Sequence, residues 1–127
     1  MTRRIVFHEG YFIKFYSKLA GGVKRKIQYT FELIKQVDMI PKKFLAPMSG
    51  QEGLFEIRIE YQSNIYRIFC CFDIGQLVVL FNGFQKKSQK TPKQEIEKAV
   101  RLKKEYFESK KNKSWKIIQK LQHSTNF

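Results

Sequence analysis

The spacing of apolar residues changes along the chain, and each change predicts a different kind of element. The segment Arg4 to His8 has a short β-rich core, and Gly10 ends it. Apolar side chains then recur every three or four residues over 12–19 and again over 27–37, which is the spacing of a helix face. A glycine pair separates the two stretches, and Pro41 ends the second, because the residue before a proline is pushed out of helical conformation. The pattern predicts a strand followed by two helices, or by one broken helix.

The centre of the chain has a period of two. Within residues 54–61, apolar and charged side chains alternate strictly from Phe55 onward, which is typical of a half-buried strand. Two apolar runs follow at 65–72 and 76–81, each preceded by turn residues, and the three segments together predict an antiparallel meander. Because these runs are apolar on both faces except at Arg67, we expect them at the centre of a sheet that is covered on both sides. The turn-rich segment 41–53 is expected to be irregular.

A third helix is predicted after the meander. Thr91 is suited to the N-cap, Pro92 to the first helical position and Gln94 to the third residue of a capping box. Apolar residues over 96–107 then keep helical spacing. From residue 109 the chain is strongly basic, and we expect either a tail or a short helix there.

These elements predict an α+β fold: an N-terminal strand and two helices, a three-stranded antiparallel meander and a C-terminal helix. A chain of 127 residues with 43% hydrophobic and 15% aromatic residues favours one packed domain, which we place at residues 1–108, with a basic C-terminal tail or short helix at 109–127. Cys70 and Cys71 are neighbours in a predicted strand, so their side chains point to opposite faces, which favours two buried thiols and not a disulfide.

Charge narrows the class of partner. The chain carries 25 Lys and Arg against 11 Asp and Glu, a formal net charge of +14. Such an excess attracts polyanions, so nucleic acid is the favoured partner and an acidic protein the second, while a basic surface without a specific ligand is the remaining interpretation. We expect no membrane partner and a cytoplasmic location, since the chain has neither a signal-peptide pattern nor a long apolar run. We expect no metal or other cofactor, because the two histidines, His8 and His123, stand outside any cluster with ligand spacing.

Three segments in order carry a family resemblance: GLFEIRI (53–59), IYRIFC (65–70) and FNGFQKKSQKTPKQEIEKA (81–99). Over residues 4–107 the chain resembles the HigB-type, often phage-derived branch of the RelE/ParE toxin superfamily. The resemblance implies a small RelE-like fold and a bacterial type II toxin that cleaves mRNA, usually on the translating ribosome, and so inhibits translation. It also implies a cognate antitoxin, commonly a helix-turn-helix protein.

Metal-free RNA cleavage by the 2′-hydroxyl needs a base, charge stabilisation at the phosphate and assistance to the leaving oxygen. Arg58 and Arg67 are the candidates for holding and stabilising the scissile phosphate, because guanidinium offers a planar fork to two phosphate oxygens. Lys86 and Lys87 follow the last apolar run, where mutual repulsion would favour the neutral amine of one of them and make it a proton-transfer group. With Lys90, they could instead only grip phosphates.

Other side chains near these cations have two interpretations. Tyr66 and Phe84 flank the charged positions and could stack on unpaired bases. Glu56 could act as the base, although a carboxylate on a strand more often pairs with a neighbour such as Arg58. The family resemblance implies a histidine near the position of Asn82 in many relatives. The amide present here cannot carry a proton at neutral pH, so the general base is not assigned. His8 is expected to be an ordinary, partly buried histidine.

Strand register decides whether the two arginines form one site. If Tyr61 lies opposite Ile65, Arg58 and Arg67 point to opposite faces; a slip of one residue puts them on the same face, which the resemblance favours.

Three functions stay open from the sequence: a ribosome-dependent mRNA endoribonuclease, a ParE-like inhibitor of gyrase, and a basic RNA-binding or DNA-binding module without catalysis.

Overall fold

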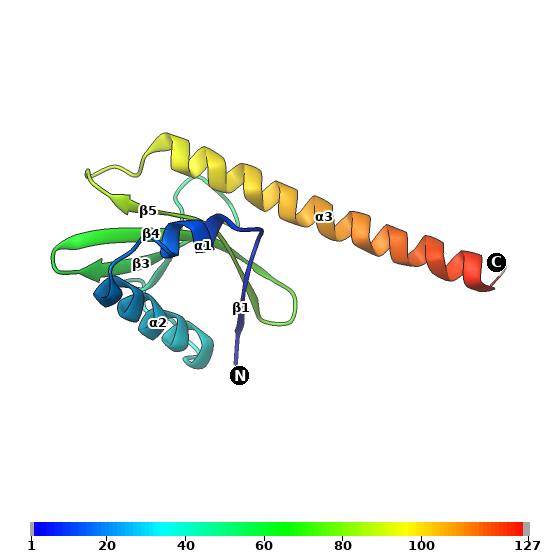
Figure 1. Cartoon of the computed structure of the whole chain (residues 1–127), viewed down its shortest axis with the longest axis horizontal. Helices are drawn as coiled ribbons and strands as arrows, with labels where there is room; N and C mark the ends of the chain where they lie inside the picture. The colour runs from blue at the N-terminus through cyan, green and yellow to red at the C-terminus, as the bar shows by residue number, and fades with distance from the viewer. Residues whose placement is uncertain (1, 126–127) are drawn as a thin grey trace.

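Eight elements make up the fold in Figure 1, a computed structural model that describes the backbone of residues 2–125 and the side chains as far as residue 113. In chain order they are β1 (Arg4–Phe7), α1 (Tyr11–Tyr16), α2 (Gly21–Gln36), β2 (Leu45–Pro47), β3 (Phe55–Tyr61), β4 (Asn64–Asp73), β5 (Leu77–Lys86) and α3 (Lys93–Thr125). The predicted α+β class and element order are confirmed. The N-terminal helical pattern forms two helices, with α2 beginning at the glycine pair.

The strands form one sheet of five in the order β1-β5-β4-β3-β2. The predicted meander is β3-β4-β5, and β4 and β5 occupy central positions as expected. Two features differ from the expectation. β1 pairs with β5 in parallel, and the three-residue β2 lies in the segment expected to be irregular, where it pairs with β3. The last strand is also longer than predicted, since β5 runs on to Lys86.

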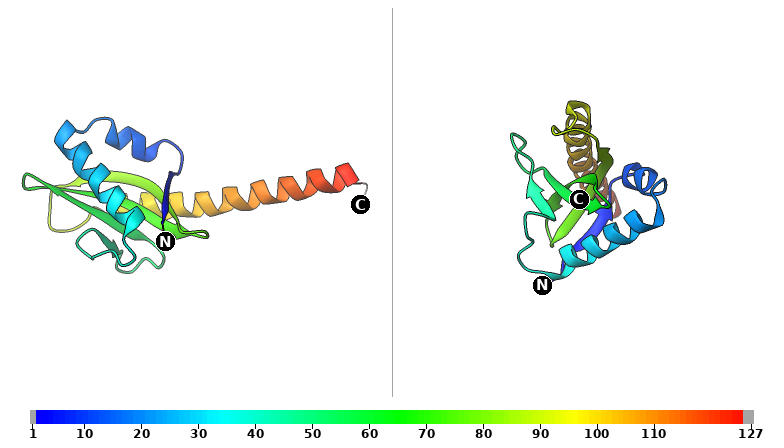
Figure 2. Two further views of the ribbon diagram at one scale, coloured as in Figure 1. Left: turned by 90° about the horizontal axis from the view of Figure 1, so that it is seen from below. Right: turned by 90° about the vertical axis from the view of Figure 1, so that its left-hand side faces the viewer.

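Helices cover both faces of the sheet (Figure 2). On one face α1 and α2 pack on a cluster that includes Ile27, Ile57 and Ile68, and on the other α3 packs on a cluster that includes Phe69 and Leu102. Within the described residues, every helix is too short or too polar to span a bilayer. The sheet is therefore a rigid layer whose strand residues point alternately toward two different sets of helices.

The adjacent cysteines illustrate this alternation. Cys70 belongs to the core on the side of α1 and α2, and Cys71 to the core under α3. Both thiols are free and buried, as predicted. Burial is the largest cause that raises the pKa of each, for Cys71 to about 12, so both side chains act as small apolar residues in the core.

Close packing of α1 on the sheet requires Gly83. A Cβ atom at this position of β5 would lie 2.5 Å from the ring of Phe15, closer than carbon atoms approach in a packed core. The glycine therefore lets the backbone of β5 touch the ring from α1, which fixes this helix across the strand that carries Lys86.

The third helix is one continuous element of 33 residues, and its far half extends beyond the sheet (Figure 1). The predicted boundary at residue 108 falls inside it. It begins at Lys93, directly after Pro92, whose carbonyl accepts bonds from Glu95 and Ile96. His123 and the other side chains of residues 114–127 lie outside the described side chains.

Asp73 at the end of β4 fastens the middle of α3 to the sheet. Its carboxylate accepts hydrogen bonds from Tyr106 Oη (2.7 Å), Lys110 Nζ (2.6 Å) and the backbone N–H of Ile74 (2.8 Å). Burial acts to raise the pKa of Asp73, but these hydrogen bonds outweigh it and the pKa lies below its ordinary value. Burial and then the bond to Asp73 raise the pKa of Tyr106.

Replacing Asp73 with asparagine should destabilise the fold at pH 7 by about 1–3 kcal/mol, because charge-assisted hydrogen bonds are lost. Because the pKa of Asp73 is lower in the folded state than its unfolded value of about 3.9, its ionised carboxylate stabilises the fold at pH values above about 3.9. This stabilisation is lost as the pH falls through the folded-state pKa. Urea unfolding of wild type and Asp73→Asn at pH 7 and near pH 3 tests this, with Glu108→Gln, an exposed carboxylate on α3, as the control. A stability difference that stays the same at the lower pH would contradict the assignment.

Candidate active site

The pairing of β3 with β4 brings the two candidate arginines together. Arg58 lies directly opposite Arg67, and Tyr61 lies opposite Asn64. This is the register that places both guanidinium groups on one face of the sheet. It is the face toward α3, since Phe69, two residues beyond Arg67 on β4, packs in the core under that helix.

Glu56 holds the arginine pair in place. Its Oε1 atom accepts a hydrogen bond from Arg58 Nε at 3.0 Å. The same oxygen forms ion pairs with Arg58 Nη2 at 2.9 Å and with Arg67 Nε at 3.8 Å. Arg67 also donates from Nη1 to the carbonyl of Tyr66 at 3.2 Å. The interpretation of Glu56 as an ion-pair partner is therefore confirmed. Because its carboxylate is buried between two cations, it is poorly placed to serve as a general base.

The two arginines differ in access to solvent. The side chain of Arg67 is only 10% exposed, whereas that of Arg58 is 37% exposed. Burial is the largest influence on Arg67 and lowers its pKa; the carboxylate of Glu56 opposes this, and the positive charge of Arg58 adds to it. Arg58 can thus contact a phosphate directly, with Arg67 adding positive charge from beneath.

The lysines lie at the adjoining edge of this face. Lys86 is the last residue of β5 and pairs with Ile65, whereas Arg67 pairs with Phe84. Lys86 is therefore a diagonal neighbour of Arg67 on the same face, about 7–8 Å away along the sheet. The sequence placed Lys86 on a turn; in the structure the strand fixes its backbone.

Lys87 and Lys90 are exposed in the connection between β5 and α3. A shallow hollow of about 360 Å³ lies between this connection and β4, lined by Ile65, Lys86, Lys87, Ser88 and Gln89. The structure thus brings Arg58, Arg67 and Lys86 to one face and puts the other two lysines at its rim.

The two aromatic candidates for base stacking are core residues. Tyr66 is 6% exposed and packs on the opposite face, among the residues covered by α1 and α2. Phe84 lies on the same face as the arginines but is 8% exposed and stacks on Phe69, with ring centroids 5.7 Å apart. Neither ring offers a free face to a base, so we omit both from the site. The burial of these two rings depends on strand alternation and on the helices that cover the sheet. It does not depend on how close the residues lie to charged positions in the sequence.

Asn82 has a structural role. Its side-chain nitrogen donates to the carbonyl and to Oε1 of Glu95, both at 3.1 Å, which joins β5 to the first turn of α3. The residue is buried. This bonding agrees with its exclusion as a proton carrier.

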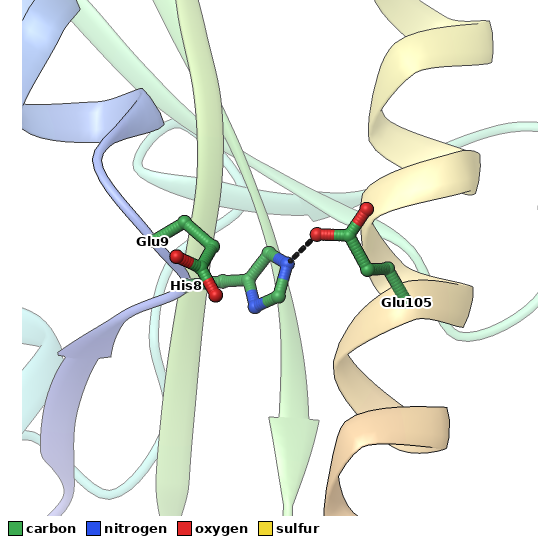
Figure 3. Close-up of side chains that lie close together, drawn as sticks. All are labelled: His8, Glu9 and Glu105. Atoms are coloured by element: carbon green, nitrogen blue, oxygen red, sulfur yellow. Dashed lines mark hydrogen bonds and ion pairs between the residues drawn. The ribbon is translucent and has the colours of Figure 1, made fainter.

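A second cluster, His8, Glu9 and Glu105, was missed in the sequence (Figure 3). His8 Nε2 lies 2.8 Å from Glu105 Oε1, and one ligand atom from each of the three residues lies within 4.8 Å of the others. This is where the described residues could hold a metal, so the expectation that His8 stands outside any such cluster was wrong. A separation of 97 residues hides the pairing of His8 with Glu105. The buried ring packs beside Tyr11, Phe81 and Tyr106, so it also links the end of β1 to α3.

Comparison with known proteins agrees with this architecture. The chain resembles a chain of the archaeal RelE-RelB complex from Pyrococcus horikoshii OT3, with a TM-score of 0.52 and 15% sequence identity, over 71% of this chain and 100% of that one. At this identity the likeness establishes the fold. No curated protein matches.

The family model named Phage derived protein Gp49-like matches residues 14–104, and the chain belongs to that family. The matched stretch includes Glu56, Arg58, Arg67 and the three lysines of the site. The family match agrees with the phage-derived character expected from the sequence, and the structural match confirms a RelE-like fold.

Removing the charge of Glu56 should be costly, since it leaves two neighbouring guanidinium groups without their shared anion. We expect Glu56→Gln to destabilise the fold by about 2–4 kcal/mol, somewhat below the cost of breaking a fully buried pair because Arg58 is partly exposed. Urea unfolding measures this, with Glu108→Gln, an exposed carboxylate on α3, as the control.

The double variant Glu56→Gln/Arg67→Gln tests the interaction between these two side chains more directly than either single variant does. Its loss of stability should be smaller than the sum of the two single losses, because either single change leaves a buried group without its partner. Strictly additive losses would show that Glu56 and Arg67 do not interact.

Proposed function

We propose that this protein is the toxin of a type II toxin-antitoxin system and inhibits translation by cleaving mRNA on the ribosome. The observation that carries the proposal is the arginine pair: Arg58 and Arg67 share one carboxylate on a rigid sheet face, and Lys86 lies diagonally beside them. A surface of this kind suits a phosphodiester and needs no metal to stabilise charge.

In the proposed reaction the 2′-hydroxyl attacks the adjacent phosphorus, the bond to the 5′-oxygen breaks, and a 2′,3′-cyclic phosphate and a free 5′-hydroxyl form. Arg58 would bind two non-bridging oxygens, while Arg67, fixed beneath it, would stabilise the charge that develops on the phosphorane. Lys86 or Lys87 would give a proton to the leaving oxygen, and Lys90 would grip a flanking phosphate. The residue that accepts the proton of the 2′-hydroxyl is not assigned.

The proposed partners follow from the same surface. A translating ribosome presents mRNA and a dense field of phosphates to a chain with a net charge of +14, so we place the action of the protein in the cytoplasm. The similar archaeal structure is a RelE-RelB complex. We propose that a cognate antitoxin, of helix-turn-helix type by the family resemblance, neutralises this chain in a comparable way.

Induced expression in a bacterium tests the nuclease function when the 5′ ends of new mRNA fragments are mapped. Wild type should arrest growth and produce cuts inside translated regions. Arg58→Ala and Lys86→Ala should each lower cleavage by about 100-fold or more, as the loss of one transition-state donor does. Lys18→Ala, an exposed lysine outside the proposed site, is the matched control and should cleave like wild type.

Lys86→Arg separates proton transfer from simple phosphate binding, because arginine keeps the charge but does not give up a proton. Cleavage should fall while RNA affinity is retained. Arrest without new cuts would contradict the nuclease and favour a ParE-like inhibitor of gyrase. A folded protein that neither arrests growth nor cuts RNA would favour a non-catalytic basic RNA-binding module.

A further inference from the structure

A second hollow adjoins the solvent-exposed side of Arg58. It measures about 160 Å³ and is lined by Lys26, Lys43, Phe44, Arg58 and Glu60. These residues come from three separate segments: α2, the connection that leads into β2, and β3. In volume it equals roughly five water molecules, which is the scale of one flat ring system and not of a longer ligand.

Hydrogen bonds hold the wall of this hollow against the arginine. The backbone N–H of Arg58 donates to the carbonyl of Phe44 at 2.8 Å, and Arg58 Nη1 approaches the carbonyl of Lys42 at 3.4 Å. Glu60 lies two residues after Arg58 on β3 and points to the same face of the sheet. A ligand in the hollow would therefore lie next to a phosphate bound by Arg58.

The lining offers both a stacking surface and a hydrogen-bond acceptor. The ring of Phe44 is half-buried, and Lys43 Nζ lies 5.0 Å from its centroid. A base that stacks on this ring can take the place of the lysine, whose ammonium group is then free to contact a neighbouring phosphate. Within residues 2–113, the carboxylate of Glu60 makes no direct hydrogen bond, and its charge attracts Arg67 only through space, which opposes the lowering of the pKa of that guanidinium by burial.

The carboxylate of Glu60 selects among bases by its chemistry. An ionised carboxylate only accepts hydrogen bonds, and it has two oxygens side by side. Guanine is the base whose Watson–Crick edge presents two adjacent donors, N1–H and the N2 amino group, whereas adenine and cytosine each present one amino group beside an acceptor. Single-stranded RNA exposes this edge for recognition.

We propose that the hollow formed by Lys26, Lys43, Phe44, Arg58 and Glu60 is a guanine-binding pocket for single-stranded RNA, next to the phosphate held by Arg58. Glu60 accepts the two hydrogen bonds from the base, Phe44 stacks on its ring, and the two lysines contact flanking phosphates. The inference deepens the proposed function, since it names the base that would set the cleavage preference.

The test uses purified protein and 2′-O-methyl uridine hexamers that carry G, A, C or U at one central position. Methylation blocks the attacking hydroxyl, so binding is measured without cleavage and without ribosomes. Fluorescence anisotropy at one fixed salt concentration should show the guanine strand binding about 5- to 100-fold more tightly than the others.

Two variants separate base selection by Glu60 from stacking by Phe44. Glu60→Gln should remove most of the guanine preference and leave affinity for the uridine strand equal to that of Glu108→Gln, which makes the same charge change on α3. Phe44→Leu should weaken all four strands alike. Equal binding of the four strands by wild type, or a guanine preference that survives Glu60→Gln, would overturn the pocket.

The outcome is independent of the nuclease experiment. If the protein prefers guanine through Glu60 but cuts no mRNA in cells, the proposed pocket stands and the proposed nuclease activity is wrong. If the protein cuts mRNA but shows no base preference with the hexamers, the proposed pocket is wrong and the proposed nuclease activity stands.

Discussion

Two positively charged side chains lie opposite each other on neighbouring strands, and one buried carboxylate makes this possible. Like charges that face each other across a sheet destabilise it, yet Arg58 and Arg67 are direct partners in the register of β3 and β4. Glu56 places one oxygen within 3.0 Å of Arg58 Nε and 3.8 Å of Arg67 Nε. Its other oxygen and Arg67 Nε have no hydrogen-bond partner within the described residues. Glu56 holds the two arginines in place but does not use all of their hydrogen-bond donors, so positive charge remains to act on a ligand.

The rest of the fold keeps this arrangement rigid and accessible from one side. Because β4 and β5 lie at the centre of the sheet and are covered by helices on both faces, the backbone beneath Arg67 and Lys86 is fixed. α3 is tied down at Asn82 and again at Asp73, so it covers the apolar part of the face and leaves the charged part open. Pre-organised charge of this kind costs little reorganisation when a phosphate binds.

Local patterns in the sequence were sufficient for every element of the fold except the three-residue β2, but not for the long-range pairing of these elements. The alternation over 54–61 predicted β3, yet a period of two fits either register, so it could not decide whether Arg58 and Arg67 share a face. The position of Tyr66 beside a charged residue in the sequence was misleading as a sign of base stacking. Strand alternation turns its side chain into the core on the other face of the sheet, under α1 and α2. The contact between His8 and Glu105 had no local signal, because it depends on how β1 and α3 meet in three dimensions.

The most direct test of the arginine pair as a phosphate-binding unit is NMR of protein labelled with ¹⁵N-arginine, titrated with an uncleavable 2′-O-methyl RNA strand. The Nε–H resonances of Arg58 and Arg67 should shift together and saturate at one affinity, because both groups share Glu56. Assignment by Arg58→Lys and Arg67→Lys identifies them. Shifts confined to the other arginines, such as Arg25 or Arg101, would place RNA elsewhere on the surface and contradict the account.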